Sequence, residues 1–430
     1  MIKKIIKKLL PANVLSCYHW SLARLAAFLF GHPSKKLIVI GVIGTNGKTS
    51  TVNIISQLLE SLGYKTGLTS TVNFKIGKKE WLNDKKMTML GRFQTQDTLR
   101  QMVKDGCQYA VIESSSQGVD QFRHLGINYD AVVFTNLTRE HIEAHGGFEN
   151  YRAAKEKLFK HLAKSKNKKI NNKISKKIII SNADDQETER LEKIKVNKFF
   201  TYSFKNKSDL QARNLDLKNG LVNFEVNNKK ISTNFLGEFN AYNILAGLAV
   251  IKALDLDFDN IEVGKLKGVP GRQEFIDNKQ DLKVLVDYAP EPIALKNLYT
   301  ALKELQYNKL IHVLGSCGGG RDKERQLILG QMAGQVADIV VVTNEDPYDD
   351  DPQQIIDKVA TGVKNKEEDK NLFKILDRKE AINKALSLAE AGDLVLITGK
   401  GAEQAICVAN NKKIPHDDRQ VVKEYFQNLK

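Results

Sequence analysis

The chain is poor in the residue patterns that mark several common classes of protein. Its four cysteines, in 430 residues, stand alone without a C-x-x-C pair, so neither a disulfide framework nor a zinc site is predicted. The glycines at 318–320 lack the G-x-G-x-x-G spacing, which argues against an NAD site. Isolated cysteines fit a reducing compartment, and we expect a cytoplasmic protein.

Acidic residues are missing from the first 36 positions, which hold seven Lys or Arg. Two short helical patterns are separated by Pro11, no cleavable signal sequence is recognised, and the apolar stretch at 22–30 is too short to span a bilayer. A basic amphipathic segment of this kind can lie on an anionic membrane surface, as a peripheral contact. We favour the alternative, a helix packed on the next domain.

The net charge is +15, and part of it lies in lysine runs at the start and at 164–177. The second run is rich in Lys and Asn and is expected to be a mobile loop. Both runs lack interleaved aromatic residues, so an anionic substrate or a solvated face explains them as well as nucleic acid does. We expect a monomer with no nucleic-acid partner.

A glycine-rich stretch at 39–51, VIGVIGTNGKTST, suggests a phosphate-binding loop. A buried strand leads to glycines that let backbone N–H groups face an anion, and a helix at about 51–62 adds its partial positive charge. The first glycine falls one position earlier than in G-x-x-x-x-G-K-[ST]. A purely structural turn would not need Lys-Thr here, so we predict a nucleoside triphosphate site at Gly44, Thr45, Asn46, Gly47, Lys48, Thr49 and Ser50. Lys48 would reach the phosphates, and the Thr49 hydroxyl would ligate Mg²⁺.

Strands then alternate with helices, as in an open α/β sheet. The expected strand 109–113 ends in Glu113, and the strand 130–135 leads to His141. Strand ends at one sheet edge suit metal ligands, so both residues are candidates for Mg²⁺, although a lone histidine is more often structural. Lys155, on an expected helix at 148–162, reads as an ordinary solvated lysine.

A turn at 268–272, GVPGR, precedes a second α/β pattern with strands at 283–287, 310–314, 339–343 and 394–398. We therefore expect three parts. They are a basic N-terminal segment (1–36), a central ATP-binding domain with a mostly parallel sheet (37–268) and a C-terminal Rossmann-like α/β domain (269–430).

Taken in order, these pieces resemble the Mur ligase family, the ATP-dependent enzymes that build the peptide stem of peptidoglycan. The resemblance covers most of the chain, and within the family it is strongest to the branch that adds the third, usually diamino, acid to a UDP-N-acetylmuramoyl-dipeptide. The motifs that carry it are GTNGKTS at 44–50, ESSSQGVDQ at 113–121, TNLTREHIEAHG at 135–146, YRAAKEKLF at 151–159, GEFNAYN at 237–243, VPGR at 269–272, VDYAPEP at 286–292, GGGRDKE at 318–324 and GKGAE at 399–403.

The resemblance implies that a substrate carboxylate attacks the γ-phosphate of ATP to give an acyl phosphate and ADP. An amine then attacks the acyl carbon, which forms the amide and releases inorganic phosphate. It implies catalytic roles for Lys48, Lys155 and His141. One Mg²⁺ would be held by Thr49 and Glu113 and a second by His141, with a carbamylated Lys155 as a further ligand. It assigns Asn243, Arg272 and Asp287 to the nucleotide, and it assigns to the substrates Thr88, Ser115, Arg123, Arg321, Asp346 and Glu403.

The sequence departs from the family pattern at three places. Only 36 residues precede the loop strand, where the family's uridine-binding domain is longer, so either the nucleotide end is bound differently or the substrate is not a UDP sugar. The D-N-P-R motif for diaminopimelate reads Glu345-Asp-Pro-Tyr348, without a guanidinium for the distal carboxylate. Histidines of the family motifs are replaced by Gln117, Pro290 and Ala402.

Two other functions remain open. One is a related ligase for another carboxylate, such as a folate or polyglutamate chain. The other is a non-catalytic ATP-binding scaffold. The joint presence of Lys48, Thr49, Glu113, His141 and Lys155 favours an enzyme, because a decayed site would have lost at least one of them.

Overall fold

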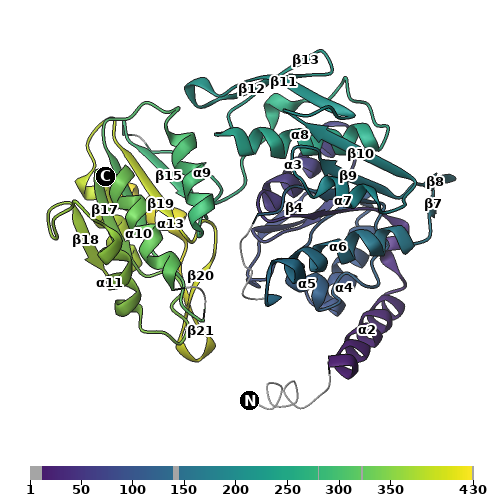
Figure 1. Cartoon of the computed structure of the whole chain (residues 1–430), viewed down its shortest axis with the longest axis horizontal. Coiled ribbons are helices and arrows are strands. Elements are labelled where there is room, and N and C mark those ends of the chain that lie inside the picture. The colour runs from purple at the N-terminus through teal and green to yellow at the C-terminus, as the bar shows by residue number, and fades with distance from the viewer. Residues whose placement is uncertain (1–11, 139–144, 279, 321–322, 429–430) are drawn as a thin grey trace. The chain divides into compact units, whose positions relative to one another are not determined.

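A computed structural model describes residues 12–138, 145–278, 280–320 and 323–428 (Figure 1). The chain divides into two compact units. The first comprises residues up to Leu215, Asn223–Ser232 and Asn240–Leu266, and the second comprises Asp216–Val222, Thr233–Phe239 and Lys267–Lys430. In the described part of the chain, no helix is both long and apolar enough to cross a membrane.

Among its described residues, the first unit is built on a sheet of eleven strands. The strands, in spatial order, are β13 (Lys229–Thr233), β12 (Val222–Val226), β11 (Leu210–Asp216), β10 (Lys198–Ser203), β9 (Ile178–Asn182), β6 (Ala131–Phe134), β1 (Ile38–Ile43), β5 (Tyr109–Glu113), β2 (Thr66–Thr69), β3 (Asn73–Ile76) and β4 (Lys79–Leu82). Pairing is parallel from β11 through β2, and β3 and β4 add antiparallel strands. The carboxyl ends of β6, β1 and β5 therefore meet at one edge.

Helices cover both faces of this sheet (Figure 1). They are α2 (Ala12–Leu29), η1 (Pro33–Lys36), α3 (Lys48–Ser61), α4 (Arg92–Lys104), α5 (Ser116–Asp120), α6 (Phe148–Lys164), α7 (Thr188–Glu192), α8 (Glu238–Ala253) and η4 (Val263–Lys265). Apolar residues of α4, α6 and α7 share one core with β1, β5 and β6. Helix α8 packs against α3 so tightly that a Cβ on Gly247 would lie 2.7 Å from Ile54 Cγ2.

The expected mobile loop at 164–177 is wrong. Strands β7 (Lys168–Ile170) and β8 (Lys173–Ser175) form a hairpin there. Lys168 is buried, pairs with Asp130 and donates to the carbonyls of Ser34 (2.9 Å) and Leu37 (2.7 Å). A composition rich in lysine suggested solvent, but these partners, distant in sequence, bury the lysine instead.

The second unit has a sheet of six strands in the described part of the chain. Their order is β14 (Glu274–Phe275), β15 (Lys283–Asp287), β19 (Leu394–Thr398), β16 (Leu310–Leu314), β17 (Ile339–Thr343) and β18 (Leu372–Ile375). All neighbours pair in parallel except β14, which is antiparallel to β15. Four of these strands have the bounds that the sequence predicted.

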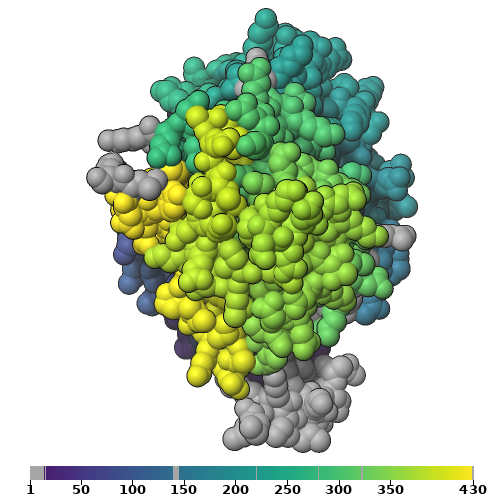
Figure 2. Space-filling model, turned by 90° about the vertical axis from the view of Figure 1, so that its left-hand side faces the viewer, coloured from purple at the N-terminus to yellow at the C-terminus, as the bar shows by residue number. Residues whose placement is uncertain are grey.

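The faces of this second sheet are covered by different helices. Residues of α9 (Pro292–Leu302), α10 (Glu324–Val336) and α11 (Pro352–Gly362) share a core with Leu285, whereas residues of α12 (Arg378–Leu388) and α13 (Asp418–Asn428) share the other with Val284 and Val286. This alternation follows the period of two along a strand. Smaller elements are η3 (Lys218–Gly220), β20 (Ala405–Val408), η5 (Ala409–Asn411) and β21 (Lys412–Pro415). Figure 2 shows the side-chain surface of this unit in green and yellow.

These observations confirm the expected fold class, a mixed α/β chain with a large, mostly parallel sheet.

Candidate active site

The glycine-rich loop lies between β1 and α3, as the sequence predicted, but α3 begins at Lys48 rather than near residue 51. Gly47 caps the helix with φ +80, and a Cβ there would lie 2.2 Å from Asn243 Oδ1. A Cβ on Gly44 would lie 1.9 Å from Thr135 Oγ1. Both positions therefore require glycine, and the loop brings backbone close to the N-terminus of α3, where an anion is stabilised.

The end of β6 holds this loop in place. The backbone N–H of Thr45 donates to the carbonyl of Asn136 (2.9 Å), and that of Asn46 donates to Asn136 Oδ1 (2.9 Å). Thr135 Oγ1 in turn donates to the carbonyl of Asn46 (2.8 Å). These three hydrogen bonds with Thr135 and Asn136 fix the loop conformation before any ligand binds.

Two lysines approach the loop from different helices. Lys48 Nζ donates to the carbonyl of Thr45 (2.6 Å), and Lys155 Nζ, from α6, donates to the carbonyl of Gly44 (2.7 Å). Lys155 is 4% exposed and its ammonium lies 4.2 Å from the centroid of the Tyr151 ring. The interpretation of Lys155 as a solvated lysine is therefore wrong: its ammonium is buried beside the loop.

Glu113 is buried at the end of β5, level with Val42 of β1. Its Oε2 accepts hydrogen bonds from Thr49 Oγ1 (2.9 Å) and from the backbone N–H of Thr71 (2.7 Å), while Oε1 accepts from Thr71 Oγ1 (2.8 Å). The structure thus joins the two candidates Thr49 and Glu113. A hydroxyl and a carboxylate oxygen side by side are donors that fit a hard cation such as Mg²⁺.

The remaining candidates of this loop lie in α3 and α8. Asn243 Oδ1 accepts a hydrogen bond from Thr51 Oγ1 (3.3 Å) and its Nδ2 donates to Asn240 Oδ1 (3.0 Å). This pairing holds the Asn243 side chain directly against Gly47. Ser50 is half-buried in the first turn of α3.

Thr88, Ser115 and Arg123 lie around the same sheet edge. Thr88 Oγ1 lies 3.0 Å from Thr71 Oγ1, within hydrogen-bond distance, which links it to Glu113. Arg123 binds the carbonyl of Met89 and donates to Gln121 Oε1 (2.7 Å). Ser115 caps α5, because its Oγ accepts from the N–H of Gly118 (3.1 Å).

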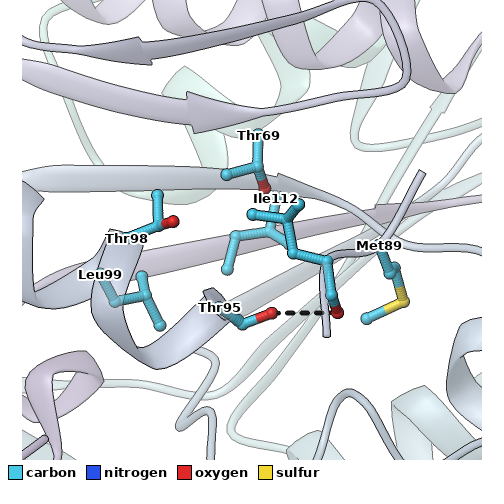
Figure 3. Close-up of a pocket in the computed structure, with 7 residues that line it drawn as sticks. Thr69, Met89, Thr95, Thr98, Leu99 and Ile112 are labelled. Carbon is cyan, nitrogen blue, oxygen red and sulfur yellow. Dashed lines mark hydrogen bonds between the residues drawn. The ribbon is translucent and has the colours of Figure 1, made fainter. Parts of the chain in front are cut away.

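A small apolar pocket lies next to Thr88, between β2, β5 and α4 (Figure 3). Thr95 Oγ1 donates to the carbonyl of Leu90 (3.2 Å) at one side of it. The lining residues are Thr69, Met89, Leu90, Thr95, Thr98, Leu99 and Ile112. None of them is charged, so this pocket does not suit phosphate groups.

In the second unit, Asp287 ends β15 and accepts the N–H groups of Gln273 and Ala289 (both 2.8 Å). Burial raises the pKa of Asp287, against the lowering effect of the Arg272 guanidinium. Arg272 also lies 4.3 Å from the centroid of the Tyr288 ring. The structure therefore brings the candidates Arg272 and Asp287 together.

Lys400 connects two further candidates. Its ammonium, which is fully buried, lies 2.8 Å from Asp346 Oδ1 and 2.6 Å from Glu403 Oε2. Burial alone would lower the pKa of Lys400, but the carboxylates of Glu403 and Asp346 raise it above its usual value. The three side chains form a charged cluster at the carboxyl edge of the second sheet.

Two predicted residues, His141 and Arg321, lie outside the described residues. Within the described ranges, no three His, Cys, Asp or Glu side chains are grouped as metal ligands.

Sequence reasoning missed several residues of these sites. Thr71 had no motif to indicate it, whereas Lys400 lies inside GKGAE and was overlooked. Tyr151 accepts or donates a hydrogen bond with Thr45 Oγ1 (3.0 Å). His145 contacts Ser116 Oγ (3.0 Å) through Nε2 and Asp120 Oδ2 (3.0 Å) through Nδ1. Both belong to motifs that the sequence offered.

Comparison with known proteins agrees with this geometry. Residues 42–251 match the Mur ligase middle domain and residues 271–401 match the Mur ligase glutamate ligase domain. A UDP-N-acetylmuramoyl-L-alanyl-D-glutamate–2,6-diaminopimelate ligase of Bacillus cereus is 36% identical over 94% of this chain and 81% of that ligase. A UDP-N-acetylmuramyl-tripeptide synthetase of Borreliella burgdorferi is 36% identical over 93% of this chain and 78% of that protein.

A solved structure of a UDP-N-acetylmuramoyl-L-alanyl-D-glutamate–2,6-diaminopimelate ligase is also similar. It matches with a TM-score of 0.61 and 30% identity, over 91% of this chain and 79% of that one. The two matched domains, the similarity along most of the chain and the loop with its two lysines identify the protein as an ATP-dependent ligase that forms amide bonds, and the chain belongs to the Mur ligase family.

Proposed function

We propose that this ligase joins an amino acid to the free carboxylate of UDP-N-acetylmuramoyl-L-alanyl-D-glutamate, with conversion of ATP to ADP. The observation that carries the proposal is the convergence of Lys48, Lys155, Thr49 and Glu113 around one phosphate-binding loop. The names of the similar ligases contain this acceptor, which supports its choice here.

The residues of the loop would bind the phosphates of ATP. The N-terminus of α3 would face the triphosphate and Lys48 would reach the β- and γ-phosphates, so that charge on the transferred group would be stabilised where it develops. Within the first unit, Asn243 would contact the nucleotide. Within the second unit, Arg272 and Asp287 are proposed as nucleotide-contacting residues. The substrate carboxylate would attack the γ-phosphate, which forms an acyl phosphate and releases ADP. The incoming amine would then attack the acyl carbon and release inorganic phosphate.

Mg²⁺ ions are part of the proposal. Thr49 and Glu113 would hold one ion, and His141 together with a carbamylated Lys155 would hold a second. When bound, such ions neutralise the phosphate oxygens and align the reacting groups. Carbamylation would turn the Lys155 ammonium into an anionic ligand, and its buried position beside Gly44 supports this role.

The motif at 345–348 does not specify which amino acid the ligase adds. Tyr348 stands where diaminopimelate ligases carry arginine, and its backbone N–H donates to the carbonyl of Cys407 (3.0 Å). A phenol cannot form the bidentate pair that a guanidinium forms with a carboxylate. We propose that Asp346, Glu403 and Arg321 contact the amino acid, with Thr88, Ser115 and Arg123 on the acceptor side.

The test is phosphate release by the purified protein with ATP, Mg²⁺ and UDP-N-acetylmuramoyl-L-alanyl-D-glutamate, paired in turn with lysine, ornithine and diaminopimelate. Mass spectrometry of the products is expected to show a new muramoyl-tripeptide with one of them. Turnover only with a pteroyl-glutamate acceptor, or ATP binding without any amide product, would contradict the proposal.

We also propose that the protein acts as a cytoplasmic monomer, with residues 37–268 as its ATP-binding domain and 269–430 as its C-terminal domain. Sedimentation at assay concentration tests the first of these statements. Limited proteolysis between the two ranges tests the second.

A further inference from the structure

Most of the large apolar side chains of helix α2 are exposed, whereas a helix that packs on a domain usually buries them. The side chains that face the first unit are small: Ala23, Ala26 and Ala27 are at most 1% exposed. A Cβ on Gly126 would lie 3.0 Å from Ala27 Cβ, which shows how closely α2 approaches the loop before β6. The expectation that this segment packs on the next domain is thus met mainly by its alanine face, with Leu22 and His19 partly buried beside it.

The opposite face of α2 carries most of the apolar bulk. The described residues include 15 exposed large hydrophobic side chains, and six of them lie on this one helix of 18 residues. They are Val14 (48%), Tyr18 (56%), Trp20 (48%), Leu25 (46%), Phe28 (70%) and Leu29 (59%). We call these six residues the α2 apolar face.

The α2 apolar face is continuous. At 3.6 residues per turn, all of its members except Trp20 project within roughly 100° of one another, whereas Trp20 projects about 80° beyond Phe28, on the side of Ala27. Helix α2 projects from the first unit, with its N-terminal half lying beyond the body of that unit (Figure 1). An apolar stripe of this width is unusual on a protein surface without a partner.

The charged residues of the N-terminal segment that carries this face are all of one sign. Residues 1–36 hold seven Lys or Arg and no acidic residue. Arg24 is exposed and its guanidinium lies 5.1 Å from the centroid of the Trp20 ring, while Lys35 and Lys36 are exposed in η1. The sequence of residues 2–10 adds apolar positions Ile2, Ile5, Ile6, Leu9 and Leu10 interleaved with four lysines.

We infer that the α2 apolar face docks this ligase on an anionic lipid surface. Tyr and Trp at its border suit the interface between headgroups and acyl chains, and Arg and Lys suit lipid phosphates. Self-association through the same face is disfavoured, because two copies would bring two sets of seven positive charges together without an acidic partner in this segment. The contact is peripheral and goes beyond the ligase reaction itself.

Vesicle binding by the full chain tests this inference. The chain has two tryptophans, so Trp81→Phe leaves Trp20 as the single reporter on α2. We expect this protein to sediment with vesicles that contain phosphatidylglycerol and much less with pure phosphatidylcholine. Trp20 emission is expected to shift to the blue and to be quenched by lipids with brominated acyl chains.

Matched variants distinguish vesicle binding through the α2 apolar face from nonspecific hydrophobic binding. Tyr18→Ser with Phe28→Ser is expected to lower the partition coefficient about tenfold, because two interfacial side chains are lost. Ile174→Ser, which removes an equally exposed side chain on the hairpin β7–β8, is expected to leave partition unchanged. Ligase activity in solution is expected to be the same in all three proteins.

Several outcomes would overturn the inference. They are the absence of sedimentation with either type of vesicle, an equal loss of binding in Ile174→Ser, and unquenched Trp20 emission in the bound protein. A dimer that the Tyr18→Ser/Phe28→Ser variant converts to monomer in light scattering would also overturn it, since the occupant of this face would then be a second copy of the chain.

Discussion

The cations beside the glycine-rich loop and those at the second sheet have different hydrogen-bond partners. In the first unit, Lys48 and Lys155 donate to backbone carbonyls of the glycine-rich loop, at 2.6 and 2.7 Å. In the second unit, Lys400 lies between Asp346 and Glu403, and Arg378 forms a pair with Asp418 in which both side chains are fully buried. A carbonyl accepts a hydrogen bond without cancelling charge, whereas a carboxylate cancels it. The first two lysines lie beside the glycine-rich loop, and the carboxylate pairs of the second unit suit a fixed framework.

Replacement of Lys48 tests the first half of this comparison most directly. Lys48→Ala is expected to lower the rate of ATP turnover at least about 10³-fold, because the cation that would bind the β- and γ-phosphates is lost. Phosphate release with saturating ATP measures it. Lys65→Ala, which removes an exposed lysine of the same unit, is the control and should remain active. Normal turnover by Lys48→Ala would remove the loop from the proposed site.

Lys155 is expected to show the next largest effect. Lys155→Ala should lower amide formation about 10²-fold or more, and a small carboxylate such as acetate or formate should restore part of it by taking the place of the carbamate. Lys160→Ala, on the same helix and exposed, is the matched control. Equal rates for the two variants, or a loss that no carboxylate relieves, would contradict carbamylation.

Lys400 tests the framework of the second unit. Lys400→Met is expected to lower the free energy of unfolding by about 3 kcal/mol, because removal of one partner leaves the Asp346 and Glu403 carboxylates uncompensated. It should also raise the KM for the amino acid more than that for ATP. Urea unfolding and steady-state kinetics measure the two effects.

The control for Lys400 is Lys379→Met, which breaks the exposed pair with Glu424 and should change stability little. If both variants unfold at the same urea concentration, Lys400 is not a structural centre of the second unit.

A smaller effect concerns pH. His312 is buried between Tyr299 OH (2.7 Å) and Thr398 Oγ1 (2.9 Å), and burial, with the positive charge of Arg378, lowers its pKa to about 3. An unfolded chain binds a proton at His312 below pH about 6.5, while the folded chain does not. Stability is therefore complete above pH 6.5 and falls as the pH drops toward 3.

Between pH 7.5 and 5.5 this difference amounts to about 1.4 kcal/mol. In His312→Asn the drop in free energy of unfolding over this interval should be smaller by that amount, as measured by urea unfolding at both pH values. An identical drop in wild type and variant would show that His312 does not titrate as described.

The features that the sequence predicted correctly have local signals in both units. Four strands of the second sheet, β15, β16, β17 and β19, were predicted with their observed bounds because short apolar runs with glycine or acidic residues after them are local signals. The glycine-rich loop was found for the same reason. Helix α3 begins three residues earlier than expected, since the backbone of Gly47 caps it directly.

The residues that sequence analysis missed or misassigned interact with partners that are distant in the sequence. Thr71 reaches Glu113 across 42 residues, and Lys168 reaches the carbonyl of Ser34 across 134. Nothing near Lys168 in sequence marks it as buried, and nothing near Lys155 shows that its ammonium meets Gly44. Only the family motifs pointed to Lys155, which a reading of helix faces assigned to solvent.

The position of β1 in its sheet has a consequence for how the site forms during synthesis. Strand β1 ends at Ile43, yet its two neighbours, β5 and β6, start at Tyr109 and Ala131. The Gly44 carbonyl meets Lys155, and Asn243 completes the wall against Gly47. A nascent chain therefore carries an unformed loop until more than half of it has left the ribosome. Contacts of such long sequence separation fold slowly, so ATP would first find its site late in translation.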